Sequence, residues 1–493
     1  EAELFFREGS IKKEDKVVHK KNEFIKNKDP INNKNQSKFN YDLTKDKRYT
    51  EDKFFFYCPI TINFKANGNE KTLNKKVSET IKKNFDGIKV LGIDRGERNL
   101  AYFSLINQNG EIEKQDSFNI VLDKFNRKNN YLEKLDKKEG QRNEARKNWT
   151  KIENIKELKE GYLSQVVHQV VKMAIENNAI IVFEDLNFVF KRGRFKIEKQ
   201  IYQKFEKMLI EKLNYLMFKD IENNKSGGLM KAYQLTPKFD SFKKLGKQTG
   251  ILFYVNANYT SKIDPKTGFV NLLYPNYENE KQAKEFFKKF DSIKYNKEKD
   301  YFEFKFDYKN FKVEEKNLPK KSKWVVCSYG ERLHQEKDPK SKAWNTVKIN
   351  LTERLKELFN NSKLDYYEGE DIKEEILKQN NAKFFKELVF LLNKILQIRN
   401  SYTSGELRKK IEKRELNFES EGDYILSCVH DKNGEFFDSR AAKEGEPKDA
   451  DANGALNIAR KGLIILERIK ESIEKPDLKI ENKEFFDFVQ SPK

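Results

Sequence analysis

The chain has 493 residues, which suggests about three domains. Hydrophobic residues make up 37% of it and aromatic residues 13%, so a wholly disordered protein is excluded. Lysine and arginine number 99 against 79 aspartates and glutamates, a formal net charge of +20. Such an excess of cations favours a polyanionic partner, and nucleic acid is the first candidate. A codon bias toward lysine is the alternative, but it does not explain why cations outnumber anions.

Cysteines and apolar runs restrict the class further. Cys58, Cys327 and Cys428 lie far apart and form no CxxC pair, which excludes a disulfide framework and a four-cysteine zinc ribbon. Any metal should therefore be bound mostly by carboxylates, which favours Mg²⁺ or Mn²⁺. We expect no transmembrane helix, no membrane partner and no signal peptide, and a location in the reducing cytoplasm. Because the chain begins Glu-Ala-Glu-Leu inside an apparent strand, we also expect it to be the C-terminal part of a longer protein.

The N-terminal half alternates between predicted strands and helices. Residues 1–50 are basic and predict irregular structure with short strands, and the run KFFFYCPITINF predicts a strand over 53–64. Two apolar runs separated by DRGER predict a β-hairpin. After a charged stretch of helical composition, an amphipathic helix, a short buried strand and a second amphipathic helix are predicted. The hairpin strands, helix, strand and second helix span residues 88–93, 99–106, 163–177, 179–183 and 197–218.

The pattern changes near residue 255. Hairpin-like segments rich in Asn, Lys and Phe continue to about residue 350. Residues 382–399 then predict a helix, and a long C-terminal helix is predicted after Pro447 within DADANGALNIARKGLIILERIK.

Three acidic residues are placed by this pattern where a nuclease would need them. Asp94 ends one buried strand, Glu184 ends another, and Asp451 opens the C-terminal helix. Two carboxylates at strand ends and one on a C-terminal helix are typical of an RNase H-like nuclease. Hydrolysis of a phosphodiester by two divalent cations needs hard oxygen ligands held on rigid elements. The sequence therefore predicts a two-ion Mg²⁺ site.

Each of these residues also has an ordinary interpretation. An aspartate after a strand is usually a turn residue, and Asp451 is placed where a helix cap is common. The string around Asp94 also resembles the phosphate hairpin of the actin and heat-shock ATPase superfamily, but no second Gly-rich phosphate loop follows. The order of strand, strand and helix in a basic chain favours the nuclease.

Four strings together, GIDRGERNLAYFSL, GYLSQVVHQVV, IVFEDLNFVFKRGRFK and DADANGALNIARKG, resemble type V subtype A CRISPR effectors. These are single-protein RNA-guided DNA endonucleases with a RuvC-like nuclease domain. The resemblance implies an α/β (α+β multidomain) fold: an RNase H-like RuvC core split by insertions, a β-rich wedge segment and an α+β Nuc domain. The implied segments are wedge 1–68, RuvC-I 69–125, bridge helix region 126–150, RuvC-II 151–255, Nuc 256–445 and RuvC-III 446–493.

The resemblance also implies site residues. Asp94, Glu184 and Asp451 match the metal-binding catalytic triad, with Asp449 as the alternative to Asp451. Arg399 in LQIRNS matches a Nuc arginine associated with target-strand cleavage, although a cation favoured at a helix C-terminus is the ordinary interpretation. Asp423 in GDYILS matches a second acidic position of the Nuc domain.

Other matching residues concern RNA and DNA binding. Residues of the wedge segment match those that process precursor guide RNA without metal, where a histidine moves protons and lysines stabilise the phosphorane. An aromatic anchor lies next to the bridge helix, and a basic turn follows Glu184, which suits contacts to a nucleic-acid backbone. The processing residues are His19, Lys28 and Lys45, the anchor is Trp149, and the basic turn contains Lys191, Arg192, Arg194 and Lys196.

The expected function is therefore that of the C-terminal nuclease half of a prokaryotic RNA-guided endonuclease. Its expected partners are guide RNA, target double-stranded DNA and the displaced single strand, and it should act as a monomeric effector with a missing N-terminal lobe. Two alternatives stay open: a catalytically inactive nucleic-acid-binding remnant, and a transposon-derived RuvC-like nuclease.

Overall fold

The computed structural model forms two compact units, Glu1–Phe64 and Lys65–Lys493. The residues it describes are 3–7, 18–19, 43–44, 53–57, 70–95, 101–122, 128–130, 155–185, 199–215, 234–247, 249–339, 344–403, 406–407, 410, 413–416, 419–473 and 478–491. The described residues of the first unit form two antiparallel pairs, β1 with β4 and β2 with β3. Their bounds are Glu3–Arg7, Lys53–Tyr57, Val18–His19 and Leu43–Thr44.

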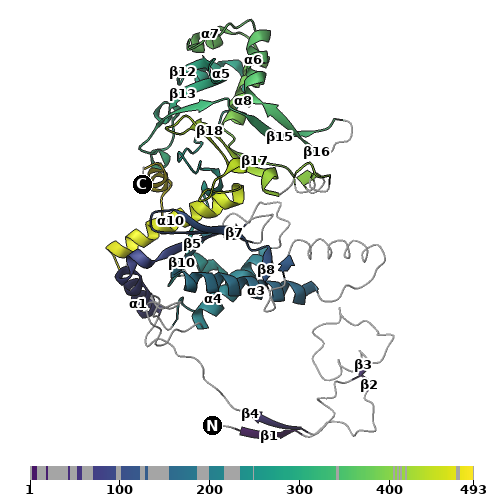
Figure 1. The fold of residues 1–493 in the computed structure, drawn as a ribbon, viewed down its shortest axis with the longest axis vertical. Coiled ribbons are helices and arrows are strands. Elements are labelled where there is room, and N and C mark those ends of the chain that lie inside the picture. The colour runs from purple at the N-terminus through teal and green to yellow at the C-terminus, as the bar shows by residue number, and fades with distance from the viewer. Residues whose placement is uncertain are drawn as a thin grey trace. The chain divides into compact units, whose positions relative to one another are not determined.

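A five-stranded mixed sheet forms the centre of the second unit, with the order β11-β10-β5-β6-β7 (Figure 1). The first three strands along the chain, β5, β6 and β7, pair antiparallel, and β10 and β11 then add in parallel on the other side of β5. The five strands span Lys89–Asp94, Tyr102–Ile106, Ile112–Ser117, Ala179–Asp185 and Leu252–Asn256. This topology places the carboxyl ends of β5 and β10 side by side.

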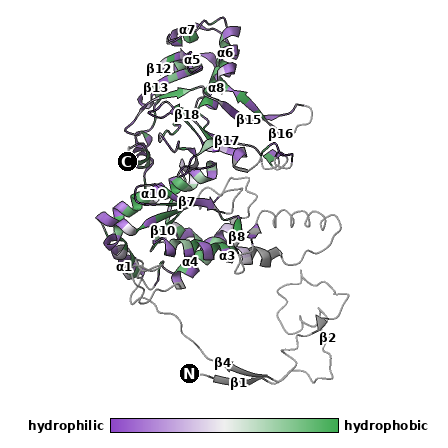
Figure 2. Cartoon of the chain, in the orientation of Figure 1, coloured by the Kyte–Doolittle hydropathy of each residue, from purple (hydrophilic) through white to green (hydrophobic). Residues whose placement is uncertain are grey.

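Helices cover both faces of this sheet, which explains why β10 is buried along almost its whole length. Helix α10 (Ala450–Glu471) packs on β5, β6 and β10, while α3 (Ile155–Glu176) contacts β10 and α4 (Lys199–Tyr215). Helices α4 and α10 each carry both hydrophobic and hydrophilic residues, as amphipathic covering helices should (Figure 2). Helix α1 (Glu70–Lys83) also packs against α10.

Two glycines allow α10 to approach the sheet closely. A Cβ atom on Gly92 of β5 would collide with the backbone of Ala459 and the carbonyl oxygen of Ala455. A Cβ atom on Gly462 of α10 would collide with Val90. The helix is therefore packed on the middle of β5 at a distance that only glycine permits.

The segment between β11 and α10 carries small antiparallel sheets. Its sheets are β12-β13-β14, β15-β16 and β17-β18-β19, and its interior is rich in buried phenylalanine. The strands span Phe290–Asn296, Tyr301–Asp307, Lys323–Cys327, Glu331–Lys337, Trp344–Asn350, Arg399–Ser401, Asp423–His430 and Phe436–Asp438, and the helices α5, α6, α7 and α8 span Glu280–Phe287, Leu351–Asn361, Lys373–Lys378 and Ala382–Ile395. Helix α11 (Asn482–Gln490) ends the described chain. None of the helices described is long and apolar enough to span a bilayer.

The structure contains the elements expected from sequence, but several of them begin or end at other residues than expected. The hairpin strands, both amphipathic helices and the C-terminal helix are confirmed, and the helix predicted to begin at residue 163 begins at Ile155. The charged stretch after residue 124 contains the short strand β9 (Lys128–Asn130), paired with β8 (Ile120–Leu122), where helical composition was expected. Helix α8 stops at Ile395, so Arg399 begins strand β17 instead of ending a helix.

Candidate active site

The carboxylates of Asp94 and Glu184 leave the same edge of the sheet. Ile93 of β5 and Phe183 of β10 are partners in the parallel ladder, so the next residue on each strand is an acidic one. Neighbouring strands are about 4.8 Å apart, and residues in register point to the same face. Asp94 and Glu184 therefore lie side by side at the carboxyl ends of their strands, with two negative charges close together.

Helix α10 supplies the third carboxylate. Asp449 is the N-cap of this helix, and its side chain accepts a hydrogen bond of 2.7 Å from the backbone N–H of Ala452. The ordinary cap role therefore belongs to Asp449, and Asp451 in the first turn is left for other contacts. One turn further on, Gly454 lies directly against the carboxylate of Asp94, with no room for a Cβ atom. The close approach of α10 brings Asp451 toward the two strand-end carboxylates.

The charges of the three residues act on one another. The pKa of Asp94 is raised well above its usual range, first by burial and then by the negative charges of Glu184 and Asp451. Burial also raises the pKa of Glu184, although the hydrogen bond from Thr260 and the charge of Lys461 oppose this shift. A raised pKa from crowded carboxylates is a feature of sites that bind cations or move protons.

Arg399 joins Asp451 to Asp423. Its Nη2 atom lies 3.0 Å from Asp451 Oδ1 and 2.8 Å from Asp423 Oδ2, and its Nε donates to Asp423 Oδ1 at 3.2 Å. Burial disfavours the charge of Arg399, but Asp423 and Asp451 outweigh burial and raise its pKa. Of the two residues expected in the Nuc domain, Arg399 thus contacts Asp451 of the proposed triad, and Asp423 contacts Arg399.

A second group of contacts fixes the carboxylate of Glu184. The hydroxyl of Thr260 donates a hydrogen bond to Glu184 Oε1. The backbone carbonyls of Thr260 and Ile263 accept hydrogen bonds from Asn457 and Asn453 of α10, at 2.8 and 2.9 Å. Both asparagines are fully buried. The segment that holds Glu184 is therefore attached to the same helix that carries Asp451.

Arg95 and Glu206 form a buried ion pair immediately behind the site. The guanidinium of Arg95 donates to the carboxylate of Glu206 on α4 and to the backbone carbonyl of Glu184. It also lies 5.4 Å from the centre of the Phe183 ring. Both members of the pair are buried, with 8% and 5% of their surfaces exposed. This pair ties the ends of β5 and β10 to helix α4 and fixes their relative position.

The carboxylates of Asp94, Glu184 and Asp451 are suitable ligands for a hard divalent ion. Such ions bind carboxylate oxygens, and a cation would relieve the repulsion that raises the pKa of Asp94. The side chains nevertheless do not form a closed cage: within the described part of the chain, no three His, Cys, Asp or Glu side chains are grouped closely enough to hold a metal. In this structure the guanidinium of Arg399 contacts Asp451.

Several expected site residues fall outside the region for which side chains are described. These are His19, Lys28, Lys45, Trp149, Lys191, Arg192, Arg194 and Lys196. Sequence reasoning missed other residues that support the site or act on its charge: Arg95, Glu206, Thr260 and Lys461. A signal existed for Glu206, because it is an acidic residue one position after Phe205 on the apolar face of the predicted helix. Thr260 carried no comparable signal, since only the fold brings it to Glu184.

Comparison with known families agrees with this geometry. A family model for the RuvC nuclease domain matches residues 66–493, which is most of the chain and includes every carboxylate of the site. It confirms the mixed α+β multidomain fold expected from sequence, with an RNase H-like core interrupted by other elements. The chemistry that goes with it is hydrolysis of nucleic acid. The chain therefore belongs to the RuvC nuclease domain family.

Proposed function

We propose that the chain is the nuclease half of a type V subtype A CRISPR effector, which cuts DNA phosphodiester bonds at a single RuvC site under the direction of a guide RNA. The observation that carries this proposal is the convergence of three carboxylates: Asp94 and Glu184 leave paired strands at the same sheet edge, and the helix of Asp451 packs against Asp94 through Gly454. The proposed segments are those expected from sequence, with RuvC parts at 69–125, 151–255 and 446–493.

The three carboxylates would hold two Mg²⁺ ions. Bound there, the ions would supply an activated water and stabilise the charge on the leaving oxygen. The protein's own groups have separate tasks. Thr260 orients Glu184, the Arg95–Glu206 pair fixes the strand ends, and Arg399 brings a positive charge that can move from Asp451 to a phosphate oxygen.

The test is cleavage of guide-matched and single-stranded DNA by the chain and by variants in which one carboxylate becomes an amide. We expect the cleavage rate to fall at least about a hundredfold in each of Asp94→Asn, Glu184→Gln and Asp451→Asn. Each change removes a carboxylate that would bind the metal ions, and those ions would stabilise the charge that develops in the transition state. Asp86→Asn is the matched control, because Asp86 is exposed and lies before the same strand. Full activity in any of the three variants would contradict the proposed triad.

Guide-RNA processing is a separate part of the proposal. His19 would move protons, and Lys28 and Lys45 would stabilise the charged phosphorane, without a metal. Processing of precursor RNA should therefore continue in EDTA, while DNA cleavage stops. Loss of processing on chelation would contradict a metal-free site. The nucleic-acid contacts proposed for Trp149, Lys191, Arg192, Arg194 and Lys196 predict weaker binding when these residues become neutral or small.

The same assays separate the two alternatives. An inactive nucleic-acid-binding remnant would bind DNA with a salt-sensitive affinity and show no cleavage at any metal concentration. A transposon-derived RuvC-like nuclease would cut DNA in Mg²⁺ without any dependence on guide RNA.

A further inference from the structure

A cavity of about 530 Å³ is lined by residues between Lys266 and Glu446, and none of Asp94, Glu184 and Asp451 lines it. Its walls come from five segments: the loop that contains Lys266, the turn between β12 and β13, the connection from β14 to β15, the β18–β19 hairpin and the loop that leads to α10. The lining residues include Lys299, Tyr329, Phe436 and Lys443. A cavity of this size is in the range of small-ligand sites.

Stacked rings form the aromatic wall of the cavity. Phe436 is surrounded by three rings: Tyr329 stacks on it with centroids 4.1 Å apart and planes at 8°, and Tyr301 and His430 meet it edge to face. Tyr329 is 40% exposed, although large apolar rings are usually covered. Phe436 covers one face of Tyr329, and a planar group that binds in the cavity can stack on the part of the ring that remains exposed.

Two of the lysines that line the cavity form no ion pair with a carboxylate among the described residues. Three of the lining carboxylates already have partners: Glu446 pairs with Lys266, Asp438 pairs with Arg440, and Asp431 accepts hydrogen bonds from two backbone N–H groups of its own turn. The fourth, Glu435, is exposed. Lys299 and Lys443 are exposed and form no ion pair with any residue that the structure describes. The cavity therefore combines an aromatic face with unpaired ammonium groups.

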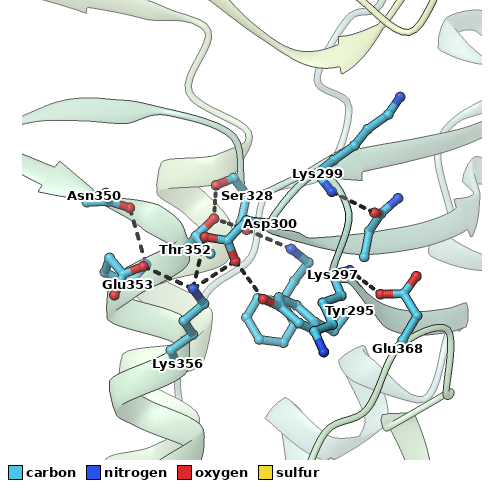
Figure 3. Close-up of polar contacts among 12 residues, drawn as sticks. Tyr295, Lys297, Lys299, Asp300, Ser328, Asn350, Thr352, Glu353, Lys356 and Glu368 are labelled. Carbon is cyan, nitrogen blue, oxygen red and sulfur yellow. Dashed lines mark hydrogen bonds and ion pairs between the residues drawn. The ribbon is translucent and has the colours of Figure 1, made fainter.

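The turn that carries Lys299 is held in place by a polar network (Figure 3). Asp300 has a positive φ of 50°. Its carboxylate accepts a hydrogen bond of 2.6 Å from the Tyr295 hydroxyl and forms an ion pair of 2.7 Å with Lys356. The next residue back, Lys299, donates through its backbone N–H to Asn296 at 3.0 Å. Its side chain points away from the network and its ammonium group contacts none of the residues drawn in Figure 3.

The connection that carries Tyr329 is fixed from both sides. The Ser328 hydroxyl lies 2.8 Å from that of Thr352 and accepts the Phe302 N–H at 2.9 Å (Figure 3). The buried guanidinium of Arg332 donates to the Tyr329 carbonyl at 3.1 Å and to the Ser427 carbonyl of β18 at 3.4 Å. Tyr329 is thus a rigid platform on a supported backbone, as an efficient stacking site requires.

Strand β18 connects this cavity to the carboxylates. Its first residue, Asp423, contacts Arg399, and its last, His430, contacts Phe436 of the cavity wall. Seven steps along a strand cover roughly 23 Å. A strand of nucleic acid that crosses the active site could therefore reach the cavity several nucleotides away.

We propose that this cavity binds one unpaired nucleotide of the DNA strand that the active site cuts. The base stacks on the exposed face of Tyr329, and Lys299 and Lys443 contact the adjoining phosphates. Stacking on an aromatic ring with lysines along the backbone is how proteins hold single strands without reading their sequence. The inference rests on the proposed nuclease function and adds to it a contact that sets the strand's position.

The test measures binding of a fluorescein-labelled single-stranded oligodeoxynucleotide by the 493-residue chain in EDTA, so that no cleavage is needed. Tyr329→Ala should weaken binding at least about fivefold, because loss of one stacked base costs about 1 kcal/mol or more. Tyr329→Trp should retain the affinity. Tyr367→Ala is the matched control, since Tyr367 is 65% exposed and lies outside the cavity.

Two further measurements address the lysines and the contact itself. Lys299→Gln should reduce the slope of log affinity against log salt by about 1, whereas Lys297→Gln, two positions earlier in the same turn and outside the cavity lining, should leave it unchanged. A strand that carries 5-bromodeoxyuridine should crosslink to the peptide that contains Tyr329. Binding of a deoxynucleoside monophosphate that is lost in Tyr329→Ala, together with no binding of the strand, would identify a free-nucleotide site and overturn the proposal.

The outcomes separate this inference from the nuclease proposal. If binding depends on Tyr329 but the chain cuts no DNA in Mg²⁺, the nuclease proposal fails and the nucleotide site stands. Unchanged binding by Tyr329→Ala, with thermal melting confirming its fold, overturns the nucleotide site even if the chain cuts DNA. Absence of any single-strand binding by the unmodified chain overturns it as well.

Discussion

Gly454 controls the position of the Asp94 carboxylate. Because the α10 backbone is fixed by its packing on the sheet, a methyl group at this position must displace Asp94. We expect Gly454→Ala to lower DNA cleavage about a hundredfold, since a shift of about 1 Å in a reacting group can cost that much. The free energy of unfolding should change by no more than about 1 kcal/mol, because alanine favours helix over glycine by a similar amount.

Gly161 provides the control for that substitution. It lies in α3, is exposed, and has no atom within 4 Å of the place that a Cβ would occupy. Gly161→Ala should stabilise the fold by up to about 1 kcal/mol and leave cleavage unchanged. Equal cleavage by Gly454→Ala and the unmodified chain would show that Asp94 needs no fixed position.

The buried Arg95–Glu206 pair makes a second prediction at the residue scale. Removing one partner leaves an uncompensated buried charge, so Arg95→Met should lower the free energy of unfolding by about 3–5 kcal/mol. Arg95→Met combined with Glu206→Leu should lose much less than the sum of the two single losses. Denaturant unfolding of the four proteins checks this, and additive losses would mean that the two side chains do not depend on each other.

At the scale of elements, Lys461 of α10 makes the stability pH-dependent. It is 2% exposed, it donates to the Asn256 and Asn258 carbonyls, and burial lowers its pKa to about 8 although Glu184 opposes the shift. An unfolded lysine titrates at roughly 10.4, so between these two pH values the unfolded chain binds more protons than the folded one. Stability contributed by this residue therefore rises with pH across that window.

The measurement is the difference in free energy of unfolding between the unmodified chain and Lys461→Met, in EDTA, from pH 7 to 10.5. Over this range the free energy of unfolding of the unmodified chain should rise by roughly 3 kcal/mol relative to that of Lys461→Met. Taking the difference removes other groups that titrate in alkali. A difference that stays constant with pH would place the charged lysine in contact with water, against its burial here.

Elements were predictable from sequence where local pattern decides them. The burial of β10 on both faces follows from its unbroken apolar run, and α10 from its spacing of small and apolar residues. The order of the strands did not follow from pattern, because the pairing of β10 with both β5 and β11 joins segments far apart in the chain. The contact of Gly92 with α10 is of the same kind, since nothing near Gly92 in sequence indicates the helix that covers it.

The candidate site shows the same division. Asp94, Glu184 and Asp451 could be chosen from sequence because each stands at the end of a recognisable element. The residues that hold them in place could not be chosen from sequence. Thr260, Arg95 and Glu206 act through contacts between residues 76 to 111 positions apart in the chain. The Arg399 contacts to Asp423 and Asp451 span 24 and 52 residues, and only the assembled unit brings all three together.

At the scale of the whole molecule, the net charge of +20 predicts how the chain binds DNA. Lysines and arginines that contact phosphates release counterions, so log affinity should fall linearly as log salt rises. A protein that neutralises six to ten phosphates loses about 10³–10⁵ in affinity between 50 and 200 mM salt, and we expect a loss of at least a hundredfold here. Anisotropy titrations of one single strand at four salt concentrations measure the slope.

Asp94→Asn separates this charge effect from catalysis. It removes one of 79 acidic residues and so should bind DNA at least as tightly as the unmodified chain, with the same slope, while its cleavage rate falls. Binding and cleavage must separate in this way if the excess of cations holds the strand and the carboxylate cluster cuts it. An affinity that does not depend on salt would instead mean that the strand is held by uncharged contacts, and the basic composition would then have no part in recognition.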